Sequence, residues 1–131
     1  FNRFFSQYRE GGFIISKFVH TASGSTWAHQ STAPMESYSG MSVADGGTGI
    51  VALSFPACNN AVIVSASIDD LASETVATIH DIYWEHIPVA LAKTGGPVPI
   101  TFYTADAAGS AKALEDPADG AVLTVIMAIN K

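Results

Sequence analysis

The last ten residues of the chain, 121–130 (AVLTVIMAIN), are apolar at almost every position. Side chains alternate between the two faces of a β-strand, so the run divides into a larger and a smaller set. The larger set is Ala121, Leu123, Val125, Met127 and Ile129, and the smaller set is Val122, Thr124, Ile126 and Ala128. A strand in a two-layer β protein normally turns one face to the core and one to water. The pattern therefore predicts a strand whose second face is also covered.

Two other runs share this character. In residues 50–55, Val51, Leu53 and Phe55 fall on one predicted face. In residues 61–68 one face takes Val62, Val64, Ala66 and Ile68, and the other takes Ala61, Ile63, Ser65 and Ser67. The second faces of both runs are small and weakly polar rather than charged. We expect contact with another subunit to cover such faces; the alternative cover is the long 30–47 loop or an N-terminal helix.

The whole chain reads as about eight strands separated by turns rich in Gly, Pro, Asn and Asp. The expected strands are 12–20, 26–30, 49–56, 61–68, 74–91 (one strand, or two with a break before Pro88), 99–106, 111–116 and 121–130. Only 69–79 has the pattern of an internal helical turn. The spacing of these segments predicts an all-β fold, an antiparallel two-sheet jelly-roll sandwich.

The N-terminal residues have a different pattern. Apolar or aromatic side chains at positions 1, 4, 5 and 8 follow helical spacing, and the glycines at 11–12 would end a helix. We expect residues 1–12 to form a stalk end or a short N-terminal helix, and residues 13–131 to form a single β-sandwich head domain.

The composition excludes several classes of partner. Hydrophobic residues make up 48% of the chain and charged residues only 14%, against about a quarter in typical domains. This shortage of charge favours a surface partly hidden in an assembly. A net charge of −6, with six scattered Lys and Arg residues, argues against nucleic-acid binding and a polybasic membrane anchor. No apolar run reaches the ~18 residues of a membrane span, so we expect no stable membrane insertion.

The segment 78–88 (TIHDIYWEHIP) is the densest polar and aromatic cluster. In a strand, His80 and His86 would share a face with Ile82 and Trp84, while Asp81, Tyr83 and Glu85 would lie opposite. Six extended residues separate the two histidines by about 20 Å, too far for one metal ion. We therefore predict no metal site here.

Other catalytic patterns are equally weak. No GxSxG elbow is present, and the adjacent carboxylates Asp69–Asp70 and Glu115–Asp116 would point to opposite strand faces. Loop 45–49 (DGGTG) lacks the frame of a phosphate-binding loop. A calcium site at Asp69, Asp70 and Glu74 would lack EF-hand spacing. The only cysteine, Cys58, is expected to be a small buried hydrophobe. We predict neither enzymatic activity nor a cofactor.

Ligand recognition is better supported than catalysis. Amphipathic aromatic residues near turns and strand ends anchor interfaces or stack on sugars. The candidate ligand-binding residues are Trp27, Tyr38, Tyr83 and Trp84. The alternative is that one or both tryptophans simply fill the core.

Two long stretches carry a family resemblance. Residues 47–70 (GTGIVALSFPACNNAVIVSASIDD) resemble the strand–FP–loop–strand pattern of viral and phage fibre-tip domains. Residues 100–113 (ITFYTADAAGSAKA) and 120–130 resemble the closing hairpin and terminal strand of the same domains. These domains are similar to trimeric tumour-necrosis-factor/C1q-like (TNF/C1q-like) jelly rolls, among them the knob of a bacteriophage tail needle or tail fibre.

The resemblance implies a non-enzymatic homotrimer at the tail tip of a virion, made in the host cytoplasm. Its partner would be a bacterial cell-surface receptor or envelope component, and residues 1–10 would suit the end of a helical stalk. We expect the smaller set of the last strand, Val122, Thr124, Ile126 and Ala128, to line the threefold axis. The alternative is a soluble C1q-like or lectin-like module that recognises a glycan or a protein.

Overall fold

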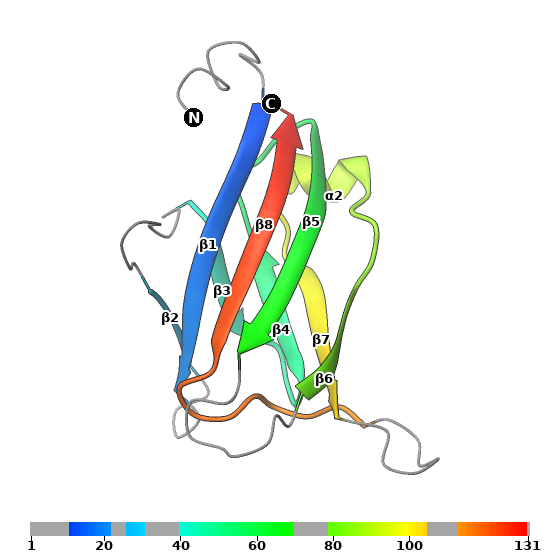
Figure 1. Cartoon of the computed structure of the whole chain (residues 1–131). Helices are drawn as coiled ribbons and strands as arrows, with labels where there is room; N and C mark the ends of the chain where they lie inside the picture. The colour runs from blue at the N-terminus through cyan, green and yellow to red at the C-terminus, as the bar shows by residue number, and fades with distance from the viewer. Residues whose placement is uncertain (1–10, 22–25, 31–39, 70–78, 105–112, 131) are drawn as a thin grey trace.

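The protein is a sandwich of two four-stranded antiparallel sheets. The computed structural model describes residues 11–21, 26–30, 40–69, 79–104 and 113–130. The elements are β1 (Gly11–Thr21), β2 (Thr26–His29), β3 (Ser42–Asp45), β4 (Ile50–Ser54), β5 (Asn60–Asp69), β6 (Ile79–Trp84), α2 (Val89–Thr94), β7 (Val98–Thr104) and β8 (Val122–Asn130). The first sheet has the order β2-β1-β8-β5 and the second β3-β4-β7-β6. Figure 1 shows β1, β8 and β5 in front of the second sheet. The all-β sandwich prediction is confirmed.

Strand β8 lies in the middle of the first sheet and pairs along its whole length with β1 and β5. The pairing of β1 begins at Gly11, opposite Asn130, and at Gly12, opposite Ile129. Both glycines, which were expected to end an N-terminal helix, are thus the first two residues of strand β1. Residues 1–10, the rest of the predicted stalk end, lie outside the described residues.

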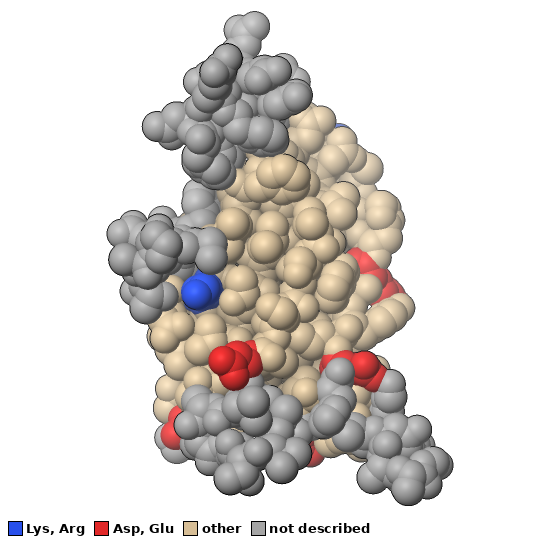
Figure 2. All heavy atoms as spheres, viewed as in Figure 1, with Lys and Arg blue, Asp and Glu red and all other residues tan. Residues whose placement is uncertain are grey.

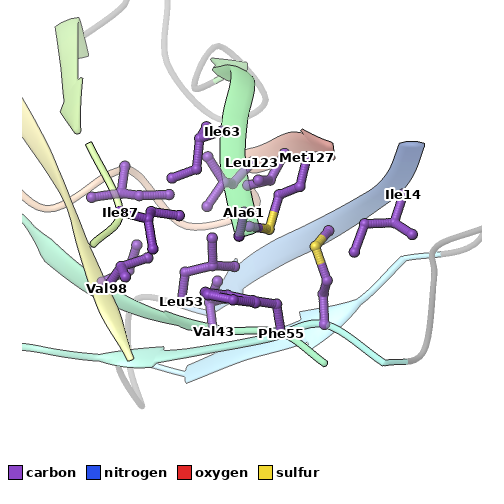
Figure 3. Packing of buried hydrophobic residues seen from close by; sticks show 14 of the residues in the cluster. Ile14, Val43, Leu53, Phe55, Ala61, Ile63, Ile87, Val98, Leu123 and Met127 are labelled. Atoms are coloured by element: carbon purple, nitrogen blue, oxygen red, sulfur yellow. The ribbon is translucent and has the colours of Figure 1, made fainter. Parts of the chain in front are cut away.

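The core lies between the sheets and follows the predicted alternation. The larger set of β8 faces inward: Leu123, Val125 and Met127 are 0% exposed. Figure 3 shows Leu123 and Met127 of the first sheet meeting side chains such as Leu53 and Val98 of the second. Val51 and Phe55 are buried as well, as the alternation in 50–55 predicts.

Strand β5 departs from its predicted alternation. A bulge shifts its pairing with β8 between Ile63 and Ser65, so the two halves of the strand use opposite sets of positions. Val62 and Val64 are each 51% exposed, whereas Ala66 and Ile68 pack against the core. The prediction that these four side chains share one face is wrong, since one extra residue in a strand reverses every side chain beyond it.

The predicted strand 74–91 is interrupted in its second half. Strand β6 ends at Trp84, and Val89–Thr94 form the short helix α2. Pro88 precedes the helix, and Gly95 ends it in the left-handed conformation, with φ of 78°. A side chain at Gly95 would place a Cβ 2.3 Å from the carbonyl oxygen of Phe55. Only glycine therefore fits this helix end.

The predicted strand 111–116 is reduced to one bridge in the part that the structure describes, between Tyr103 and Leu114. This segment is held instead by single contacts at the end of the second sheet. The amide of Glu115 donates to Phe102, and the carboxylate of Asp116 accepts a 2.6 Å hydrogen bond from the amide of Gly49. Most of the possible helical turn at 69–79 lies outside the described residues.

Candidate functional site

The smaller set of β8 lies on the outer face of the first sheet. Val122, Thr124, Ile126 and Ala128 are half-buried there, between outward side chains of β1 and β5. Ile126 is opposite Ile15 on one side and Ser65 on the other. The two sets of β8 therefore face opposite ways, the larger into the core and the smaller away from it.

This outer face divides into an apolar and a polar half. We call the half nearer the C-terminal end of β8 the apolar patch; it consists of Phe13, Ile15, Val62, Val64, Ile126 and Ala128. Phe13 is 42% exposed, more than a core position of a sheet would be. Figure 2 shows a broad area without charged atoms over β8, with charged atoms toward the left edge, the lower end and the right rim.

The other half of the face is polar. Lys17 and Ser67 are the partners of Thr124 across β8, and Asp69 is the partner of Val122. Together with Gln30 and Ile68 these residues line a shallow hollow. In this half Thr124 has polar partners on both sides, whereas Val122 lies between Asp69 and the apolar Val19. Ile126 and Ala128 have mainly apolar neighbours.

The alternative covers for this face are only partly described. Residues 40–47 of the long loop contribute β3, which pairs with β4 in the second sheet and so lies on the other layer of the sandwich. Residues 31–39 and 1–10 lie outside the described residues. Helix α2 buries Ala92 in the core and leaves Val62 and Val64 half exposed.

The candidate ligand-binding aromatics do not form one cluster. Trp27 packs inward, with its ring 4.6 Å from that of His20 and 6.3 Å from that of Phe102. Trp84 also packs against the core. Tyr83 points the opposite way from Trp84 and is 53% exposed, and Tyr38 lies outside the described residues. Of the three described aromatics, Tyr83 alone has more than half of its surface exposed.

A second tyrosine, which the sequence pattern did not single out, lies beside Tyr83. Tyr103 of β7 lines a shallow hollow together with Asp81, Ile82 and Tyr83 of β6; we call this site the tyrosine hollow. Tyr103 is opposite Asp81 in the β6–β7 pairing. The alternation of residues 99–106 places Tyr103 on the face opposite the buried Phe102, a signal that could have identified it.

The described residues provide little for catalysis. Among them, no three His, Cys, Asp or Glu side chains lie close enough to hold a metal ion. No buried side-chain nitrogen or oxygen of this part of the chain lacks a hydrogen-bond partner. Residues 45–49 form the turn between β3 and β4, where the Asp45 carboxylate accepts from the amide of Gly47. The structure does not describe Asp70, Glu74 or the side chain of His80.

Cys58 is buried at 6% exposure, as predicted. Its thiol points at the carbonyl oxygen of Ala92, 3.8 Å away. Burial raises the pKa of the Cys58 thiol, and backbone hydrogen bonds at Asn60 and Asn130 offset part of this rise. The thiol is therefore a poor nucleophile at neutral pH, because the reactive thiolate is scarce.

Among the described helices, none has the length and apolar character that a membrane crossing requires. No family model, curated protein or solved structure matches the chain. The two features of the described residues that bear on function are therefore the outer face of the first sheet and the tyrosine hollow.

Proposed function

We propose that the chain is the head of a homotrimer that forms the tip of a virion, as a tail needle knob or tail fibre head. It acts without enzymatic activity, in attachment to the host surface or penetration of the cell envelope. Its partners are two further copies of itself and a bacterial cell-surface receptor or envelope component. The single observation that carries the proposed assembly is the apolar patch on a sheet face that points away from the core.

The energetics of the patch favour its burial between subunits. Phe13, Val62 and Val64 expose 42–51% of their surface in one chain. If each subunit hides on the order of 600 Å² of apolar area, the gross gain is about 15 kcal/mol per subunit at ~25 cal/mol per Å². Association entropy and side-chain ordering offset part of this gain. A gain of this size would make the subunit's stability depend on assembly.

The number of subunits and the viral context come from the resemblance to TNF/C1q-like tip domains. The short side chains of Thr124 and Ala128 on β8 suit a close approach of three copies at an axis. The start of β1 at Gly11 and the end of β8 at Asn130 lie together at one end of the sandwich (Figure 1). A stalk formed by residues 1–10 would join the head at this end, beside the apolar patch.

The alternative function is a soluble C1q-like or lectin-like module that recognises a glycan or protein partner. The exposed ring of Tyr83 is compatible with this function, because an exposed aromatic ring can stack on a glycan. The two functions differ in their target. A virion tip is a stable trimer that sediments with purified bacterial envelopes, whereas the alternative module binds a soluble ligand and leaves envelopes unbound.

An envelope-binding assay tests the proposal. Purified chain is mixed with envelope fragments from a panel of bacterial species, and the bound fraction is measured after centrifugation. The proposal expects saturable binding to the envelopes of one or a few species. Equal binding to all envelopes, or to none of a broad panel, would contradict host attachment.

A further inference from the structure

The tyrosine hollow lies on the outer face of the second sheet, on the opposite side of the sandwich from the apolar patch. Tyr83 is opposite Thr101 and Tyr103 is opposite Asp81, so the two tyrosines are diagonal neighbours on adjacent strands. Diagonal neighbours on one sheet face lie about 7–8 Å apart, within reach of one ligand. A trimer joined through the first sheet would leave all three hollows open.

Leu114, 39% exposed, is bridged to Tyr103 at the end of the second sheet, and the remaining described strands of this outer face carry shorter side chains. The outward residues of the neighbouring strands are Ser42, Ala44, Ile50, Ala52, Ser54, Pro99 and Thr101. The hollow beside the rings measures about 380 Å³, at the small end of ligand sites, which span ~300–1,000 Å³. Its size suits one or two sugar rings better than a folded protein.

The chemistry of the hollow matches a saccharide. A tyrosine ring offers an apolar face on which the C–H face of a pyranose can stack, and its hydroxyl makes hydrogen bonds. The carboxylate of Asp81 lines the hollow, and that of Glu85 lies 3.5 Å from the Tyr83 hydroxyl. Carboxylate oxygens accept hydrogen bonds from sugar hydroxyls. A sugar ring has C–H faces that stack on aromatic rings and hydroxyl groups around its edge that need hydrogen-bond acceptors. The hollow offers both kinds of partner.

Charge restricts the class of saccharide. The described cations are Lys17 on the first sheet and Lys93 in α2, and neither lines the hollow. Among the described residues, the charged groups at the hollow are thus the carboxylates of Asp81 and Glu85, and the whole chain carries a net charge of −6. Like charges repel, so sialylated or phosphorylated sugars are disfavoured and neutral sugars are accepted.

From this geometry we infer that the tyrosine hollow binds a neutral saccharide of the bacterial envelope, with Tyr83 as the principal stacking residue. This inference rests on the proposed attachment function and names its receptor class. Each hollow is shallow and binds weakly, and three copies on one trimer raise the apparent affinity at a polysaccharide surface.

Backbone amide NMR on the full chain tests this inference. The probes are lactose, maltotriose, cellotriose, chitotriose and mannotriose, each titrated to about 20 mM because weak single-site affinities fall in the millimolar range. Sialyllactose serves as the anionic counterpart of lactose. We expect at least one neutral probe to shift the amides of residues 81–83 and 101–103, and sialyllactose to shift them less than lactose does.

Three variants separate stacking from general effects. Tyr83→Ala should weaken binding of the active probe at least about fivefold, because it removes one stacked ring. Tyr83→Phe keeps the ring and should retain most of the affinity. Val89→Ala changes a 50% exposed side chain of α2 and should leave binding unchanged.

Several results would overturn the inference. One is the absence of shifts in these amides with every neutral probe; another is binding that persists in Tyr83→Ala. Stronger binding of sialyllactose than of lactose would refute the assignment to neutral sugars. The mass of the same sample separates the two proposals, since a sugar-binding monomer contradicts the trimer alone. A trimer without sugar binding contradicts only this inference.

Discussion

Replacing Ile126 by aspartate tests the proposed interface at one side chain. Ile126 lies near the middle of β8 on the outer face, between Ile15 and Ser65, and is half-buried within a single subunit. Its side chain does not enter the core, which Val125 and Met127 fill from the opposite face. A charge at this position therefore acts mainly on whatever covers the outer face.

The loss of stability caused by Ile126→Asp depends on whether the side chain faces solvent in a lone subunit or is buried between subunits. In a lone subunit the variant loses about half the burial of an isoleucine and some strand propensity, about 1–2 kcal/mol in total. At a threefold axis three unpaired carboxylates would be buried together, at several kcal/mol each, or on the order of 10 kcal/mol for the assembly. We expect the variant to dissociate the trimer or to prevent folding.

Sedimentation equilibrium and thermal unfolding measure this outcome, with Ile50→Asp as the matched control. Ile50 is also a half-buried isoleucine, on the outer face of the second sheet opposite Thr101. The control should cost a similar 1–2 kcal/mol within the subunit and keep the trimer. If Ile126→Asp remains a folded trimer with an unchanged melting temperature, Ile126 faces solvent and the interface argument is refuted.

Two predictions test the local structure. Gly49→Ala should destabilise the fold by more than Gly47→Ala does. Both glycines have positive φ, so both substitutions strain the backbone. A Cβ at Gly49 would also lie 2.7 Å from the amide nitrogen of Glu115, whereas a Cβ at Gly47 would have no atom within 4 Å. Urea unfolding measures the difference, expected to exceed about 1 kcal/mol; equal effects would contradict the tight packing at Gly49. Because burial raises its pKa, the Cys58 thiol should react far more slowly with a disulfide reagent at pH 7–8 in the folded protein than in urea. Equal rates would show that Cys58 is accessible.

The sequence predicted the parts of the fold that depend on local alternation. The inward set of β8 and the buried residues of β4 follow a period of two, and the core forms as that period requires. Helix α2 escaped prediction because its few residues continue an apolar run after Pro88, although glycine at 95 marks its end. The β5 bulge between Ile63 and Ser65 escaped because no residue in that run signals an extra position.

The candidate sites could be predicted only as far as single strands allow. Alternation in 78–88 separated Tyr83 from Trp84, and the structure places them on opposite faces of β6. Tyr103 was missed because its proximity to Tyr83 comes from the pairing of β6 with β7, which brings together residues about twenty positions apart. The division of the outer face into apolar and polar halves likewise depends on the register of β1, β8 and β5.

The molecular mass of the unmodified chain in solution tests the central claim most directly. Sedimentation equilibrium at micromolar concentration should give three times the 13.7 kDa mass of the chain, because burial of the apolar patch holds three copies together. A single species of 13.7 kDa at that concentration would contradict the proposal that the outer face of the first sheet is a subunit interface.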